Sequence, residues 1–149
     1  MRYGYIRGQE WPSQSFGGDQ NAQQTVNNIV NYIRDQKPNA RFAKIMAYLW
    51  REWKLKLYFC EKFWYVDLNS EYRMLLRPVQ MNDGSTYVCI EIYRRQHEHV
   101  PTLEEHKTFL NKSSSPEKAE ENFPEHTRGN SANSTSTCRQ EAAKKSKKN

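Results

Sequence analysis

The fold of this 149-residue chain is decided by two adjoining stretches, Thr25–Lys37 (TVNNIVNYIRDQK) and Ala40–Lys54 (ARFAKIMAYLWREWK). In both, apolar residues recur every three or four positions, which is the spacing of an amphipathic helix. Pro38 disfavours helical geometry in the residue before it, so the first helix is predicted to end at Lys37. A connection this short makes the helices neighbours in space. The sequence therefore predicts two helices that pack through their apolar stripes.

The second helix divides into an apolar face and a basic face. At about 100° per residue, its large apolar residues share one arc and its basic residues share the complementary arc. We expect the apolar arc, with both tryptophans, to be buried and the basic arc to face solvent. The apolar arc holds Phe42, Ile45, Met46, Leu49, Trp50 and Trp53, and the basic arc holds Arg41, Lys44, Arg51 and Lys54.

Most of the chain's net charge of +6 belongs to this helical region. Residues 21–57 contain seven Lys or Arg against two Asp or Glu, a net charge of +5. A basic surface favours anionic partners, such as nucleic acid or an acidic protein surface. Helix faces that are charged only for solubility are an equally ordinary alternative.

The segment Glu61–Met74 fits two structures. Its Phe63-Trp64-Tyr65-Val66 run is rich in aromatic and β-branched residues, as strands are. Against this, Phe59, Phe63, Val66, Ser70 and Met74 recur at helical spacing, and several neighbours have no β preference. A helix is the preferred interpretation, and a strand is the alternative.

A β-hairpin is predicted next. Leu75–Met81 and Thr86–Tyr93 flank the turn Asn82-Asp83-Gly84-Ser85. The Asp-Gly pair supplies the positive φ that tight hairpin turns require, and the second segment is dense with β-forming residues. Pro78 has no backbone N–H, so the first strand is expected at an edge of its sheet.

The rest of the chain is predicted to lie outside this domain. Residues 1–20 contain scattered glycines and aromatic residues, typical of an irregular arm. Residues 96–110 are expected to be a loosely ordered extension, with a short helical turn near Leu103 to Leu110. Residues 111–149 contain too little apolar surface to offset their ordering entropy, which predicts a disordered basic tail. The expected fold class is α+β: a small domain over residues 21–95, with two or three helices and a C-terminal hairpin.

The order of these elements between Gln24 and Ile92, with its Asn-Asp-Gly hairpin, resembles a winged-helix domain. The length and the hairpin are similar to the linker-histone globular type. The resemblance implies DNA or chromatin binding through the third helix and the wing. It places the first helix at Thr25–Lys37, the second at Ala40–Lys54, the recognition position at Glu61–Met74 and the wing at Leu76–Ile92.

The charges of the recognition segment depart from this pattern. Residues 61–74 carry two basic against three acidic residues, and acidic groups near phosphate oppose the counterion release that drives binding. This layout keeps open the alternative that the domain docks a protein. The residues of the wing that are better placed for phosphate contact are Arg77, Arg94 and Arg95.

No sequence pattern indicates a metal site, a cofactor or a catalytic group. His97-Glu98-His99 and His106 lack the further ligands that zinc requires. Cys60, Cys89 and Cys138 form no Cys-x-x-Cys pair, which favours a reduced compartment, and Cys89 is expected to be a small buried side chain. We therefore expect a non-enzymatic protein with no small-molecule substrate evident, and no membrane partner because no long apolar run occurs.

The leading functional hypothesis is a nuclear protein that associates with DNA or chromatin largely through charge. Arg41, Lys44, Arg51 and Lys54 would meet phosphates, together with the arginines of the wing. The alternative is a protein-interaction module that docks a partner through exposed aromatic residues, with Trp50 and Trp64 the best placed to protrude. The lysines that resemble a nuclear import signal are Lys144, Lys145, Lys147 and Lys148.

Overall fold

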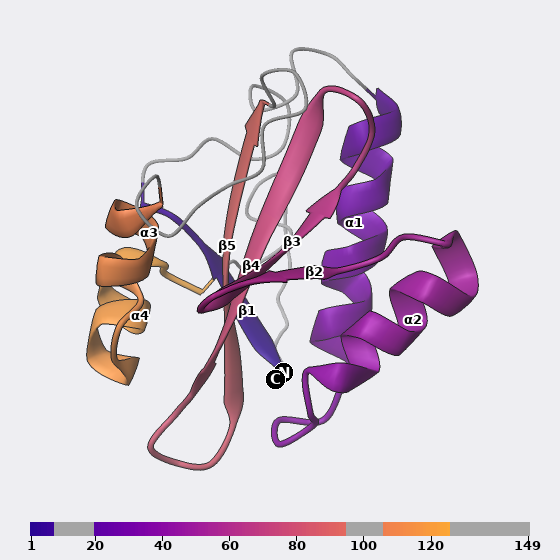
Figure 1. Cartoon of the computed structure of the whole chain (residues 1–149). Helices are drawn as coiled ribbons and strands as arrows, with labels where there is room; N and C mark the ends of the chain where they lie inside the picture. The colour runs from indigo at the N-terminus through magenta and orange to yellow at the C-terminus, as the bar shows by residue number, and fades with distance from the viewer. Residues whose placement is uncertain (8–19, 95–105, 126–149) are drawn as a thin grey trace, which may run out of the picture.

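The computed structural model describes residues 1–7, 20–94 and 106–125. These residues form three layers, with a five-stranded sheet between two pairs of helices (Figure 1). Helices α1 (Gln20–Asp35) and α2 (Ala43–Trp53) cover one face of the sheet, and helices α3 (Lys107–Lys112) and α4 (Pro116–Asn122) cover the other. The α+β class is therefore confirmed.

The sheet is mixed, with the strand order β1-β5-β4-β3-β2. Its strands β2 to β5 form an antiparallel meander, while β1 pairs in parallel with β5, from Arg2 opposite Tyr87 to Tyr5 opposite Ile90. Strand β2 therefore forms one edge. The strand bounds are Arg2–Tyr5 (β1), Tyr58–Cys60 (β2), Phe63–Asp67 (β3), Tyr72–Gln80 (β4) and Thr86–Arg94 (β5).

The preferred helix over residues 61–74 is wrong. This segment forms β3, a turn and the start of β4. Phe63 and Tyr65 enter the core under α3 and α4, and Val66 enters the core under α1 and α2. A strand covered on both faces is apolar on both sides and loses the alternation that would identify it. Strands therefore stand where the winged-helix pattern has its recognition helix. The features still shared with that pattern are the two helices and the pairing of β4 with β5.

Strands β4 and β5 pair about the Asp-Gly turn, but they are followed by α3 and α4 and so are not a C-terminal hairpin. The expected edge position of the first of these strands is also wrong. Strand β4 lies between β3 and β5. Pairing between β3 and β4 ends at Trp64 opposite Leu76, so Pro78 lies beyond it and is paired only with Val88 of β5. A residue without an N–H is tolerated there because no β3 partner requires one.

The folded unit is larger than predicted at both ends. Part of the expected irregular arm forms β1, whose Tyr3 and Tyr5 are buried. Part of the expected disordered tail forms α4, which ends against the buried Phe123. The extension contributes α3 in the same way, through Phe109. These few apolar residues are enough to hold both ends of the chain on the domain, because they pack against a second apolar face of the sheet.

Glu91 of β5 allows a test of whether α3 and α4 bury the second face of the sheet. Alternation along β5 places Glu91 on the side of Tyr87 and Cys89, beneath α3 and α4. It is half-buried, and loss of hydration raises the pKa of its carboxyl.

Glu91→Gln is expected to stabilise the protein at pH 7. Because the pKa of Glu91 is raised in the folded state, its ionised carboxylate disfavours folding. This penalty is largest above the folded pKa, and it disappears as the pH falls from the folded pKa to the ordinary carboxyl pKa. Urea unfolding at pH 7 and near pH 4 should therefore show a gain that shrinks at the lower pH. The exposed control Glu121→Gln should have little effect. A Glu91→Gln protein that is less stable at pH 7 would contradict this account.

Candidate interaction surface on helix α2 and strand β2

Exposed aromatic side chains gather where α2 leads into β2. Among the described residues, the large hydrophobic side chains that are exposed all lie between Trp50 and Phe59. Exposed hydrophobic side chains that lie close together are candidates for an interaction surface. The exposed fractions are 56% for Trp50, 44% for Trp53, 44% for Tyr58 and 57% for Phe59.

Helix α2 buries a narrower stripe than its sequence suggested. Ile45 and Leu49 are fully buried, whereas Trp50, about 100° around the helix from Leu49, points into solvent. The expected burial of the tryptophan face is therefore wrong, whereas Trp50 protrudes as the protein-docking alternative expected. The helix packs along its side against α1 and the sheet, so only residues near the Ile45–Leu49 line reach the core.

Two tyrosines fix α2 against α1. The rings of Tyr32 and Tyr48 are stacked with centroids 3.7 Å apart, and the Trp53 indole N–H donates to the Tyr48 hydroxyl at 3.0 Å. By helical geometry, Trp50 projects from the flank of α2 roughly 160° away from Tyr48. Trp50 therefore lies on the flank of α2 that faces away from α1.

Rings continue from α2 onto the sheet. Trp64 of β3 lies between Phe42, with centroids 6.2 Å apart, and Phe59 of β2, with centroids 4.7 Å apart. Trp64 was expected to protrude, but it is only half-exposed and packs against the core. Phe59 therefore takes the exposed position at the edge of the sheet, on the α2 side.

Lysines accompany the exposed rings. Lys54 Nζ lies 5.5 Å from the centroid of the Trp50 ring, and Lys56 Nζ lies 5.5 Å from that of Tyr58. These are cation–π distances. We define the aromatic–basic surface as the exposed residues on the α2 side, which are Trp50, Trp53, Lys54 and Phe59.

The basic residues that the sequence predicted lie on α2 or next to its ends. Arg41, Lys44, Arg51 and Lys54 are all exposed, as expected. Arg51 pairs with Glu52 at 3.1 Å, whereas no ion pair within the described ranges involves Arg41 or Lys44. Residues 41–62 hold six Lys or Arg against two Glu, a net charge of +4. Residues 106–125 hold three Lys against four Glu, a net charge of −1, so α2 and β2 form the basic side.

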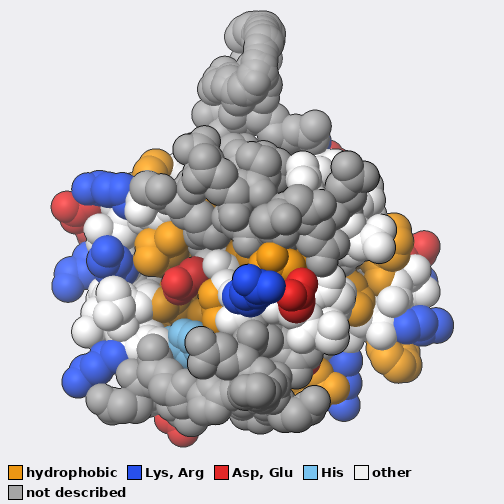
Figure 2. All heavy atoms as spheres, turned by 90° about the horizontal axis from the view of Figure 1, so that it is seen from above, with side chains coloured by type: hydrophobic (Ala, Val, Ile, Leu, Met, Phe, Trp, Pro, Cys, Tyr) orange, Lys and Arg blue, Asp and Glu red, His pale blue; other side chains and the backbone are white. Residues whose placement is uncertain are grey.

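The arginines predicted on the wing do not extend this surface. Arg77 is half-buried on the other face of the sheet, where Nη1 donates to the Leu110 carbonyl at 3.4 Å and burial lowers the pKa of its guanidinium. Arg94 is exposed but pairs with Glu71 at 2.7 Å. At that end of the sheet, acidic and basic side chains lie next to each other (Figure 2). Arg95 and the lysines at 144, 145, 147 and 148 lie outside the described residues.

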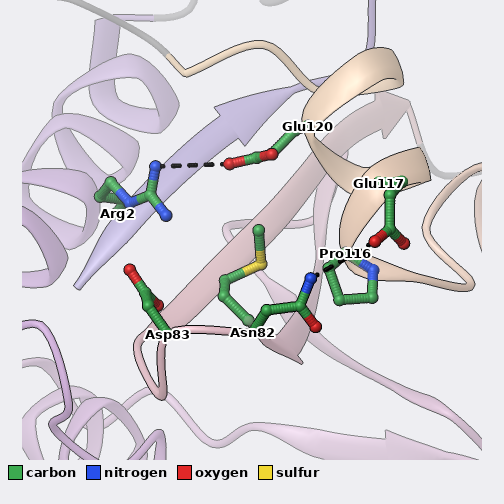
Figure 3. Close-up of a pocket in the computed structure, with 7 residues that line it drawn as sticks. Arg2, Asn82, Asp83, Pro116, Glu117 and Glu120 are labelled. Carbon is green, nitrogen blue, oxygen red and sulfur yellow. Dashed lines mark hydrogen bonds and ion pairs between the residues drawn. The ribbon is translucent and has the colours of Figure 1, made fainter.

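A hollow of about 200 Å³ lies between the β4–β5 turn, β1 and α4 (Figure 3). Its polar groups bind one another. Asn82 donates to Glu117 at 3.3 Å, Arg2 pairs with Glu120 at 3.7 Å, and Asp83 accepts from the backbone N–H and hydroxyl of Ser85. These bonds join the turn to α4 and leave few groups for a ligand.

The described residues contain no group of three His, Cys, Asp or Glu side chains that could hold a metal ion. Burial raises the pKa of the Cys89 thiol to about 12, so this cysteine is inert, as its place in a strand predicted. No helix within the described ranges is long and apolar enough to cross a membrane.

No protein family model, no curated protein and no solved structure matches this chain.

Proposed function

We propose that this is a non-enzymatic nucleic-acid-binding protein that makes contact through the aromatic–basic surface and the basic face of α2. The observation that carries the proposal is the coincidence of exposed rings with a net charge of +4 over residues 41–62. Exposed lysines attract phosphates, and exposed rings offer faces to bases. Nuclear association with DNA or chromatin, expected from the lysine run at 144–148, is part of this proposal.

The energy of such binding comes mainly from released counterions. Each phosphate neutralised by a lysine or arginine adds about 0.7 to the salt slope for a single strand and about 0.9 for a duplex. Four single-strand contacts would thus weaken binding about 50-fold between 50 and 200 mM salt. Arg41, Lys44, Lys54 and Lys56 supply four exposed cations.

A second candidate function is protein docking at the edge of β2. Strand β2 pairs only with β3 within the described residues, and Tyr58 and Phe59 expose apolar rings there. An open edge can accept a strand from a partner. The basic surroundings favour an acidic partner, which is the alternative that the sequence suggested.

Charge reversal on α2 tests the proposal. Lys44→Glu/Lys54→Glu is expected to weaken binding to a fluorescent 20-nucleotide single strand at least tenfold at 50 mM salt, because two phosphate contacts become repulsive. The matched control Lys107→Glu/Lys118→Glu makes the same change in net charge at exposed positions of α3 and α4. It should weaken binding less than threefold.

Fluorescence anisotropy across a salt series measures both effects. The proposed function is rejected if the wild-type protein does not bind at 50 mM salt, or if its affinity does not change with salt concentration. Equal losses in the two double variants would show that net charge, and not this surface, governs binding.

A further inference from the structure

We infer that the nucleic acid on this surface is single-stranded and that its bases stack on Trp50 and Phe59. This inference rests on the proposed function and names its substrate class. The two rings are the most exposed large hydrophobic side chains among the described residues. They come from different elements, the last turns of α2 and the edge strand β2.

Both rings lie on the side of the sheet that α1 and α2 cover. Phe59 contacts Trp64, which packs with the core under α1 and α2, and Trp50 projects from the free flank of α2. Tyr58 alternates to the opposite side of β2, where its ring stacks on Tyr65 at 5.3 Å. Trp50 and Phe59 therefore belong to the α2 side of the sheet, whereas Tyr58 faces the opposite side.

Other aromatic rings of the domain hold Phe59 in position without a ligand. The hairpin of β2 and β3 turns within two residues, Glu61 and Lys62, and Glu61 adopts the left-handed conformation with a φ of 60°. The ring of Phe59 rests on Trp64, which rests in turn on Phe42. Because these rings are already positioned, little conformational entropy is lost when a base stacks on Phe59.

The ammonium group of Lys54 lies next to the Trp50 ring. Lys54 follows α2 in the left-handed conformation, with a φ of 54°. Its N–H donates to the Trp50 carbonyl at 3.1 Å, and the Leu55 N–H donates to the Leu49 carbonyl at 3.0 Å. This cap places the Lys54 ammonium over the Trp50 ring. A base that takes the ring face would bring its phosphate toward Lys54, so that stacking and charge act on the same nucleotide.

A duplex fits the same surface less well. In a double helix, the faces of the bases are covered by their neighbours, so exposed rings have nothing to stack on. Proteins that read a duplex groove form hydrogen bonds to the edges of the bases, whereas Trp50 and Phe59 present mainly apolar ring faces. The lysines would still attract its phosphates, so weak, salt-sensitive duplex binding remains expected.

The test compares three probes of equal length at 100 mM salt: a 12-nucleotide thymidine strand, a 12-unit abasic strand and a 12-base-pair duplex. The abasic strand keeps the phosphates and lacks the bases. We expect the thymidine strand to bind at least tenfold more tightly than the abasic strand. Trp50→Ala and Phe59→Ala should each weaken thymidine binding roughly 5- to 100-fold, the range for one stacked base.

Three controls separate stacking from other effects. Neither substitution should change abasic binding more than about twofold. Tyr58→Ala removes an aromatic side chain of similar exposure from the other side of β2 and should leave thymidine binding within about twofold. Trp50→Tyr keeps a ring and should retain most of the affinity. Circular dichroism melting verifies that each variant is folded.

The outcomes distinguish this inference from the proposed function. Equal binding of the thymidine and abasic strands overturns stacking and leaves charge-driven binding standing. Tighter binding of the duplex than of the thymidine strand also overturns the inference. Failure of all three probes to bind rejects both and leaves protein docking at β2.

Discussion

Gly4→Ala should destabilise the protein by about 2–3 kcal/mol, although it adds one methyl group. A Cβ atom at Gly4 would overlap the Phe123 carbonyl oxygen and lie 2.6 Å from the Tyr87 hydroxyl and 2.7 Å from the Pro124 carbonyl oxygen. Two of these atoms belong to the backbone and cannot rotate away. The segment after α4 must therefore move off β1, and the buried Phe123 must move with it. Urea unfolding followed by circular dichroism measures the loss.

A second glycine and a double variant sharpen this test. A Cβ at Gly84 meets nothing within 4 Å, and its φ of 87° alone should cost about 1 kcal/mol in Gly84→Ala. In a Phe123→Ala background the segment is already loosened, so Gly4→Ala should cost less than in the wild type. Fully additive losses would show that the clash at Gly4 does not act through this segment.

Asp67→Asn should destabilise the protein by about 2–4 kcal/mol, far more than an ordinary surface change. The side chain of Arg73 is only 3% exposed, and its Nε lies 2.5 Å from Oδ1 of Asp67, which is 32% exposed. The guanidinium also lies 4.5 Å from the centre of the Tyr65 ring. Because Arg73 is enclosed by the sheet and its neighbours, the substitution leaves a buried cation without its carboxylate.

The exposed pair at the same end of the sheet provides the control. Glu71 and Arg94 are 50% and 70% exposed, so Glu71→Gln should cost less than about 0.5 kcal/mol. Arg73→Met combined with Asp67→Asn should recover much of the loss, since no buried charge then remains at that position. If Asp67→Asn costs no more than Glu71→Gln, the ion pair does not stabilise this end of the sheet.

The elements that sequence analysis predicted well are those whose pattern is local. Val26, Ile29, Val30 and Ile33 recur on one stripe of α1, and all are buried. The Asp-Gly turn of the hairpin occurs as predicted, with Gly84 at a φ of 87°. The second helix begins at Ala43, three residues later than predicted. The reason is not local: β5 holds the preceding connection, through bonds from Thr86 to the carbonyls of Pro38 and Ala40.

The elements that sequence analysis missed depend on partners far away in the chain. Strand β3 lacks a simple alternation because both of its faces are covered, and the helical spacing of Phe59, Phe63 and Val66 is a coincidence. Two signals could have been used. Tyr3 and Tyr5 alternate as a strand does, and Ser115-Pro116 is a typical helix start, with the Ser115 hydroxyl accepting from the Lys118 N–H at 3.2 Å.

The candidate surface was only partly predictable for a related reason. The sequence identified the basic residues of α2, because polar residues on an amphipathic helix face solvent wherever the helix packs. It could not show how much of the apolar arc would be covered. That depends on where α1 and the sheet meet α2, and the exposed members of the arc are Trp50 and Trp53.

The parallel pairing of β1 with β5 sets the order in which this protein can be completed during synthesis. Arg2–Tyr5 leaves the ribosome roughly eighty residues before its partner Thr86–Arg94. At typical translation speeds the first strand waits about 4–16 seconds, with its tyrosines exposed to chaperones. The nascent chain therefore completes this pairing with a strand that was made long before its partner.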